Sequence, residues 1–174
     1  MQTNTNQIIN YHKNHNHLRS IDMTYTFKKD NYTISTDQSL LQFDVIHDFL
    51  RTSYWSPAIP MDVVKRAAEG SIAFGIYKDS GEQVGYARVV SDCATFAYLG
   101  DVFVLDSERG KGLSKWLMTC ILQLPELQGL RRWSLATRDA HGLYAQFGFT
   151  PLDTPETVMQ IARPNIYEEL AKND

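Results

Sequence analysis

The stretch Leu99–Trp116 reads LGDVFVLDSERGKGLSKW, and its pattern changes once, in the middle. Its first part is apolar except for Gly100 and Asp101, as in a strand that is covered on both faces. From Leu113 onward, apolar residues recur at intervals of three and four, which predicts a helix that begins near Lys111 and lays one face on a sheet. The stretch therefore predicts a buried strand that runs through a glycine-rich turn into a helix.

The turn between the predicted strand and helix is Arg109-Gly110-Lys111-Gly112. Glycines let the backbone pass close to a ligand. The first amides of a helix have no acceptor within the helix, and the helix dipole and the two cationic side chains add positive potential. We therefore expect this turn to bind an anion such as a phosphate or pyrophosphate.

The segment from Arg109 to Ser114 resembles the R/Q-x-x-G-x-G/A signature of the GNAT superfamily of N-acetyltransferases. Val104 precedes Arg109 by five residues, as the strand valine does in that family. Two motifs in the expected order make the resemblance specific. The second is the family's A-x-x-L-Y-x-x-x-G-F motif, matched by Ala140, Leu143, Tyr144, Gly148 and Phe149.

The resemblance implies that the loop holds the pyrophosphate of acetyl-coenzyme A. The residues it implies for this coenzyme are Phe103, Val104, Arg109, Gly110, Lys111, Gly112, Leu113 and Ser114. Two positions depart from the family pattern: Ser114 replaces a Gly or Ala, and Thr137 stands where Asn is frequent. A Walker-type loop needs Gly-Lys-Ser/Thr, and this chain has Gly112-Leu113-Ser114, so we set the nucleotide hydrolases aside.

Composition limits the class of protein. The 174 residues, 43% of them hydrophobic, are enough for one domain with a substantial core. A formal net charge of −3 argues against general nucleic-acid binding, and no window has the roughly 20 apolar residues of a membrane span. Cys93 and Cys120 lack C-x-x-C spacing and no apolar signal segment opens the chain, so we expect a soluble cytoplasmic protein.

The chain divides into three parts. Residues 1–20 are rich in Asn, His and Gln and are expected to form a flexible tail. Residues 21–165 are expected to form the acetyltransferase domain, and residues 166–174 a short C-terminal tail. The tail histidines could chelate a metal ion, although a polar tail needs no such role, and no metal site is expected. They are His12, His15 and His17.

The order of the predicted elements is that of a mixed α/β fold. The resemblance implies the GNAT fold, a central, mostly antiparallel sheet with flanking helices and one splayed parallel strand pair. The predicted strands are 32–35, 71–77, 83–90, 94–105, 132–136, 149–152 and 157–161. Four helices are predicted. The first has an apolar stripe from Leu41 to Leu50 and is capped by Asp37 or Ser39, and the second covers residues 61–69. The third runs from 111 to about 125, and the fourth is capped by Thr137 or Asp139 and ends at Gly148.

Three residues are candidates for binding the acceptor. Tyr54 and Trp55 lie in a loop stiffened by prolines, and the corresponding family loop lines the acceptor pocket; structural packing is an equal interpretation. Arg88 interrupts an apolar strand, so it either binds the acceptor or pairs with Asp92 or Asp101.

Acetyl transfer to an amine needs a proton acceptor, oxyanion stabilisation and a good leaving group. Asp101 lies where the family's catalytic carboxylate often falls, and pairing with Arg88 or a backbone amide is its alternative role. Tyr144 matches the family tyrosine that protonates the departing sulfur, or is a core tyrosine. A backbone amide near Phe103 is expected to stabilise the oxyanion.

The sequence thus predicts a single-domain, acetyl-CoA-dependent N-acetyltransferase that acts by direct transfer. The expected acceptor is a small primary amine. A protein amino group, or a non-catalytic module that binds acyl-CoA as a sensor, are the alternatives. Many family members are dimers through exposed strands near the C-terminus, so a homodimer is one option, and the sequence leaves the oligomeric state open.

Overall fold

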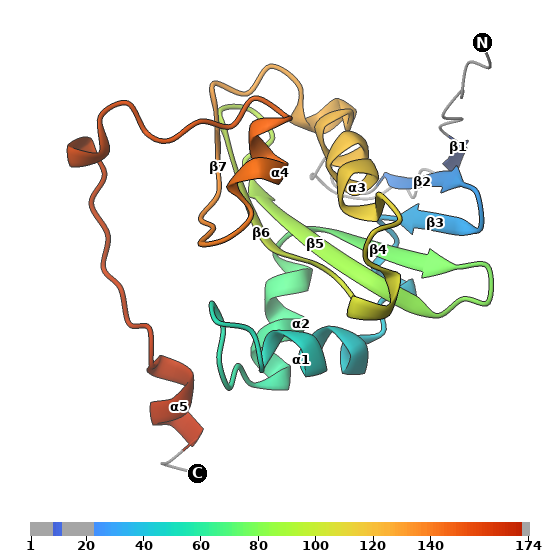
Figure 1. Cartoon of the computed structure of the whole chain (residues 1–174), viewed down its shortest axis with the longest axis horizontal. Coiled ribbons are helices and arrows are strands. Elements are labelled where there is room, and N and C mark those ends of the chain that lie inside the picture. Colours follow the sequence, from blue (N-terminus) through green and yellow to red (C-terminus); the bar gives the residue numbers. More distant parts are fainter. Residues whose placement is uncertain (1–8, 12–22, 172–174) are drawn as a thin grey trace, which may run out of the picture.

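A seven-stranded sheet forms the centre of the computed structural model, which describes residues 9–11 and 23–171 (Figure 1). The strands follow one another across the sheet in chain order, and only β6 and β7 are parallel neighbours. The strands are β1 (Ile9–Tyr11), β2 (Thr24–Lys29), β3 (Tyr32–Ser35), β4 (Ile72–Lys78), β5 (Gln83–Ser91), β6 (Phe96–Val104) and β7 (Arg132–Ser134).

Helices cover both faces of the sheet. The helices are α1 (Phe43–Leu50), α2 (Met61–Glu69), α3 (Leu113–Leu122), α4 (His141–Ala145) and α5 (Ile166–Ala171). Short 3-10 helices are η1 (Gln38–Leu40), η2 (Asp106–Glu108), η3 (Pro125–Leu127) and η4 (Pro155–Thr157). Figure 1 shows α1 and α2 on one side of the sheet and α3 and α4 on the other. The fold is therefore the predicted mixed α/β sandwich.

Two apolar cores lie on the two faces of the sheet. The larger core packs α3 and Tyr144 against the sheet, and the smaller packs α1 and α2 against the opposite face. Because strand side chains alternate between faces, Phe103 belongs to the smaller core and its neighbour Val104 to the larger. The end of β6 is thereby anchored on both sides.

Most predicted elements are confirmed, with shifts at their ends. The helix α2 has the predicted bounds, and the meander β4–β5–β6 is antiparallel as expected. The helix α3 begins at Leu113 rather than near Lys111, because Gly112 has a φ of 76° and cannot belong to a right-handed helix. Asp37 caps η1 and Gln42 is the N-cap of α1, so the prediction that Asp37 or Ser39 caps this α-helix is wrong.

The first hairpin was predicted only in part. The strand β2 alternates between half-buried and buried side chains and pairs with β3, and only the latter strand was predicted. Within the predicted tail, Ile9–Tyr11 pairs with β2 as β1. The three tail histidines lie outside the described residues. None of the described helices combines the length and hydropathy needed to cross a membrane.

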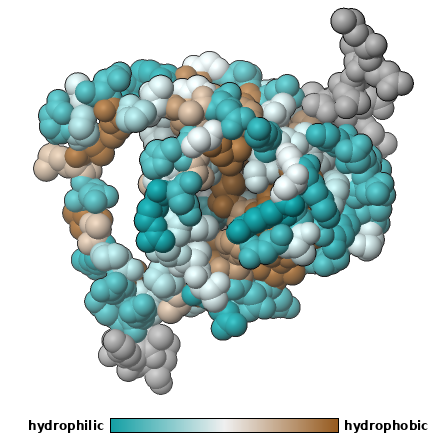
Figure 2. All heavy atoms as spheres, in the orientation of Figure 1, coloured by the Kyte–Doolittle hydropathy of each residue, from teal (hydrophilic) through white to brown (hydrophobic). Residues whose placement is uncertain are grey.

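The two predicted final strands, 149–152 and 157–161, are wrong. These residues form loops and part of η4, and none of them pairs with a strand of the described chain, so their backbone groups lack the partners that a strand needs. We call residues 151–165 the C-terminal arm. Figure 2 shows the arm on the left, with apolar atoms, separated from the rest of the molecule by an open gap.

Candidate active site

The glycine loop presents a row of unpaired backbone amides. Gly110 and Gly112 have φ values of 80° and 76°, a left-handed conformation that glycine adopts without strain. Among the described residues, no acceptor lies within hydrogen-bonding distance of the amides of residues 110–115, and Trp116 is the first to bond, to the carbonyl of Gly112. The loop and the first turn of α3 thus form a candidate anion-binding site of backbone groups.

The edge of β6 next to the glycine loop is open. The strand β7 pairs with β6 only over Phe96–Tyr98, so the two strands separate before Val104, as the predicted splay requires. The Leu105 amide donates to the Val84 carbonyl at 2.8 Å. Successive backbone groups of a strand face opposite edges, so the amide of Phe103 faces β5 and the amide of Val104 faces the open edge. Among the backbone amides near Phe103, the one that faces the open edge is therefore that of Val104.

A bulge in β6 turns Asp101 toward two of the predicted acceptor residues. Asp101 has a φ of 55°, and the register between β5 and β6 shifts at this point. Its Oδ2 accepts from Nε of Arg88 at 2.5 Å, and its Oδ1 accepts from Nε1 of Trp55 at 3.1 Å. The side chain of Asp101 is only 8% exposed. The structure thus brings Trp55, Asp101 and Arg88 together in one hydrogen-bonded chain.

Asp92 does not pair with Arg88. Its carboxylate accepts from the amides of Ala94, Thr95 and Phe96 and so closes the turn between β5 and β6. These bonds hold the pKa of Asp92 well below its usual range, with the Thr95 hydroxyl and amide as the largest causes. The structural alternative for Arg88, an ion pair with Asp101, is the one observed.

Aromatic side chains line the acceptor side of the site. Phe49 stacks on Phe103 with ring centroids 3.9 Å apart, and Trp55 lies edge-on to Tyr54 at 4.9 Å. The Tyr54 and Trp55 side chains are still 39% and 40% exposed. Phe49 was predicted only as part of the stripe of its helix. Its contact with Phe103 could not be predicted from the sequence, because helical periodicity does not show which strand residue a helix side chain contacts.

Tyr54 connects two loops across the site. Its hydroxyl donates to Asp139 at 3.3 Å and accepts from the Arg138 amide at 3.0 Å. The Arg138 guanidinium lies over the Tyr54 ring, 3.9 Å from its centroid. Sequence reasoning missed Arg138 as a site residue and predicted Thr137 or Asp139 as the cap of the next helix. That prediction is wrong, because the N-cap of α4 is Ala140, whose amide donates to the Thr137 hydroxyl at 3.0 Å.

Tyr144 is buried in α4 next to Phe149, with which it makes an edge-on ring contact at 5.9 Å. Burial, with smaller contributions from Tyr54 and Asp139, raises the pKa of Tyr144 to about 12. The phenol is therefore protonated at neutral pH, which a general acid requires.

The two cationic side chains of the glycine loop are both paired. Arg109 binds Asp106 at 2.8 Å and reaches the Val104 carbonyl at 3.4 Å. Lys111 binds Glu108 at 2.6 Å. Leu113 is buried in the core, and Ser114 is half-buried in the first turn of α3. The anion site therefore consists mainly of backbone amides.

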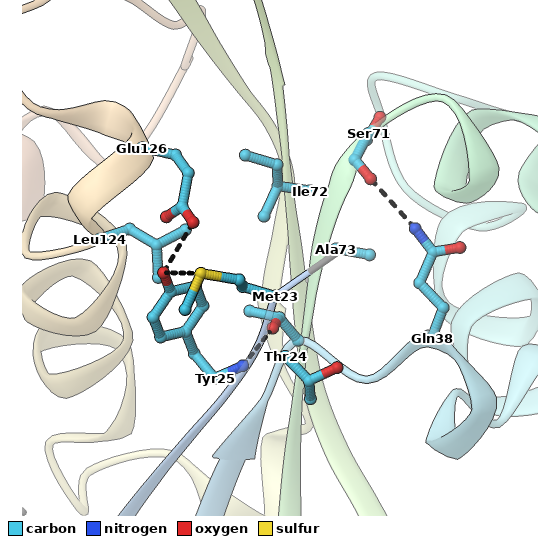
Figure 3. A pocket seen from close by; sticks show the side chains of 10 residues that line it. Met23, Thr24, Tyr25, Gln38, Ser71, Ile72, Ala73, Leu124 and Glu126 are labelled. Atoms are coloured by element: carbon cyan, nitrogen blue, oxygen red, sulfur yellow. Dashed lines mark hydrogen bonds between the residues drawn. The ribbon is translucent and has the colours of Figure 1, made fainter. Parts of the chain in front are cut away.

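A separate cavity of about 350 Å³ lies between β2, β4 and η3 (Figure 3). The Tyr25 hydroxyl donates to Oε1 of Glu126 at 2.6 Å at its border. None of the predicted site residues lines this cavity. In the part of the chain that the structure describes, no group of three His, Cys, Asp or Glu residues is placed to hold a metal ion.

Comparison with known proteins agrees with this geometry. Residues 69–151 match the model of the GNAT acetyltransferase domain. A Gibberella zeae protein named "Putative acetyltransferase" is 31% identical over 149 residues, which cover 73% of this chain and 83% of that protein. A Xanthomonas campestris crystal structure described as belonging to the GNAT family is 51% identical with a TM-score of 0.77, covering 80% of this chain and 99% of that one.

A more distant structure resembles the chain in fold alone. It is a Clostridium acetobutylicum structure with acetyl-CoA, 14% identical with a TM-score of 0.55, and the match covers 76% of this chain and 95% of that one. The stronger matches, together with the glycine loop and the open strand edge, identify the family. The chain belongs to the GNAT family of acetyltransferases.

Proposed function

We propose that the protein transfers the acetyl group of acetyl-CoA directly to the primary amine of a small molecule. The observation that carries the proposal is the row of backbone amides of residues 110–115, which have no acceptor among the described residues and lie beside the open edge of β6. Such amides at a helix N-terminus suit a pyrophosphate. The open edge offers backbone groups to an extended pantetheine arm.

The amide of Val104 is the proposed oxyanion donor. It faces the open edge, where the thioester carbonyl of a bound acetyl-CoA would follow the pantetheine arm. A backbone amide is held rigidly in the strand and needs no reorganisation when negative charge develops on the carbonyl oxygen. Direct attack by the amine then needs no covalent enzyme intermediate.

In this proposal Asp101 is the proton acceptor and Tyr144 is the proton donor. An alkylamine with an ordinary pKa near 10.4 must lose a proton before it attacks. Asp101 is the buried carboxylate on the acceptor side, and it receives this proton directly or through a water. Tyr144, a phenol that stays protonated at neutral pH with its pKa raised to about 12, donates to the departing thiolate.

The shape of the acceptor side supports a small acceptor over a protein amino group. The hydroxyl of Tyr54 joins the α1–α2 loop to the β7–α4 loop through Arg138 and Asp139. A polypeptide acceptor needs an open groove, whereas this connection ties the two loops to each other at Tyr54. A small amine needs no such groove and can bind without breaking this connection.

A thiol-release assay tests the proposal. Acetyl-CoA is combined with polyamines, amino acids, aminoglycosides and peptide N-termini, and acetyl-CoA binding is measured separately by calorimetry. Binding together with thiol release by one class of small amines is the expected result. Release by peptides alone would replace the small acceptor with a protein. Binding without release would indicate a sensor module, and no binding would overturn the function.

A further inference from the structure

Glu108 is a buried carboxylate directly before the glycine loop. Its side chain is only 6% exposed. Oε2 accepts from the hydroxyl of Tyr32 at 2.5 Å and from Nζ of Lys111 at 2.6 Å. Oε1 lies 3.1 Å from Nζ of Lys78. The carboxylate therefore joins three parts of the chain, namely β3, β4 and the glycine loop.

The bonds to Glu108 are of the strong, charge-assisted kind. Bonds from Lys111 and Tyr32 lower the pKa of Glu108 from 4.5 to about 2, despite the opposing effect of burial, so the carboxylate is ionised at neutral pH. A buried carboxylate with several donors fixes the groups that bind it, because loss of one partner leaves a charge uncompensated. The glycine loop is thereby attached to the sheet at Lys111.

The ammonium of Lys111 is directed toward the sheet. Besides Glu108, it lies 3.1 Å from the Tyr32 hydroxyl and 5.9 Å from the centroid of the Tyr32 ring. Sequence reasoning had placed this cation among the groups that bind the pyrophosphate. In the structure, the ammonium of Lys111 instead bonds to groups of the protein itself, Glu108 and Tyr32.

We infer that Glu108 and Lys111 are a positioning pair, which holds the amides of the glycine loop in the conformation that binds the pyrophosphate. This role rests on the proposed function. Lys111 acts through Glu108 and not as a direct ligand of the phosphates. The two residues consequently act as one unit, because removal of either breaks the bond between Lys111 in the loop and the buried carboxylate.

A double-mutant cycle tests this pair. Glu108→Gln keeps the shape of the side chain and removes its charge, and Lys111→Met keeps the aliphatic stem. Each variant is expected to raise the KM for acetyl-CoA about tenfold, the effect of one charge-assisted bond, with kcat and the KM for the amine unchanged. The double variant is expected to show the effect of one substitution, not the product of two.

Glu82→Gln is the matched control. Glu82 also binds Lys78, at 2.9 Å, but lies in the exposed turn between β4 and β5 and does not contact the glycine loop. This variant removes one carboxylate from the same lysine and is expected to leave the KM for acetyl-CoA unchanged.

A truncated substrate separates positioning from general damage to the fold. S-acetylpantetheine lacks the pyrophosphate, so its kcat/KM is expected to be the same for wild type and Glu108→Gln. Tighter acetyl-CoA binding by Glu108→Gln, or multiplicative effects in the double variant, would assign Lys111 to the phosphates and overturn the inference. Calorimetry on the wild type distinguishes failure of the positioning role from failure of the proposed function. If the wild type does not bind acetyl-CoA, the proposed function itself is overturned.

Discussion

Asp101 shows how one backbone angle organises the acceptor side of the site. Its φ of 55° is uncommon for a residue other than glycine, although aspartate adopts it more readily than most, and it lies within a long strand. The resulting bulge places the carboxylate between Arg88 and Trp55. Strained conformations of this kind persist where the surrounding contacts hold them, and they cluster at functional sites.

Asp101→Asn tests the proton acceptor. The amide cannot receive a proton from the amine, so kcat is expected to fall by roughly 10²-fold or more while acetyl-CoA affinity stays unchanged. Steady-state kinetics and calorimetry measure the two quantities. Trp55→Phe is the control, because it removes a donor to Asp101 and keeps the carboxylate. An equal loss in both variants would assign Asp101 to positioning Trp55.

Tyr144→Phe tests the general acid. The substitution removes only the hydroxyl from a buried ring, so the packing against Phe149 is kept. Because a thiolate with an ordinary pKa near 8.5 is already a fair leaving group, kcat is expected to fall by about 10²-fold or less. An unchanged rate of thiol release in a stopped-flow assay would show that Tyr144 contributes only to packing in the hydrophobic core.

At the scale of elements, the glycine loop and α3 form one functional unit. The loop supplies amides and left-handed turns, and α3 supplies its N-terminus and the apolar face that fixes the loop on the sheet. Space is not the reason for glycine at position 112, since a Cβ there would meet no atom within 4 Å. The backbone conformation is the reason.

Gly112→Ala tests this conformational requirement. The left-handed φ of 76° would cost an alanine about 1–2 kcal/mol, so the loop is expected to relax and the KM for acetyl-CoA to rise several-fold. Gly142→Ala in α4 is the control, since that glycine has neither a positive φ nor a close neighbour. An unchanged KM in Gly112→Ala would show that the loop keeps its function in another conformation.

At the scale of the whole molecule, Glu108 links the stability of the fold to pH. Its pKa of about 2 in the folded state lies below the ordinary value of 4.5, so the folded protein binds this proton less readily than the unfolded chain. The corresponding stabilisation is present above pH 4.5 and is lost as the pH falls toward 2. Other carboxylates titrate in the same range, so a variant is needed to isolate the contribution of Glu108 to the pH dependence of stability.

The difference between wild type and Glu108→Gln measures this linkage. We expect the difference in the free energy of unfolding to be constant above pH 5 and to shrink between pH 4.5 and 2. Urea denaturation at a series of pH values gives the difference directly. A difference that is independent of pH throughout this range would contradict the assignment.

The C-terminal arm exposes large apolar side chains to solvent. Met159 and Ile161 are 95% and 94% exposed. Large apolar side chains in an exposed group mark interaction surfaces, and a homodimer is an option that the sequence analysis leaves open. We therefore propose that a second copy of the chain covers the arm.

Variants of the arm test this association by light scattering. Met159→Asp and Ile161→Asp are expected to convert a dimer into monomers, because a charge would be buried without a partner. Ser80→Asp in the exposed β4–β5 turn is the control and is expected to remain dimeric. A monomeric wild type, or a dimer that survives both arm variants, would contradict the proposal.

Local sequence patterns determined the elements around the glycine loop. Glycine at 110 and 112, and the change from a strand pattern to helical spacing at Leu113, predicted the strand, the loop and the helix, because backbone conformation and periodicity depend on neighbouring residues. The same reasoning predicted α2 with its correct bounds. It failed for the final strands, because a strand needs a partner that its own sequence does not specify.

The contacts within the site were decided only by the tertiary structure. The sequence left Arg88 with two carboxylates as partners, and the bulge at Asp101 selects one of them. In the same way, the register of β6 against β5 turns the amide of Val104, not that of Phe103, to the open edge. These contacts join residues from separate strands and loops, so they depend on how the sheet is assembled and not on any local pattern of residues.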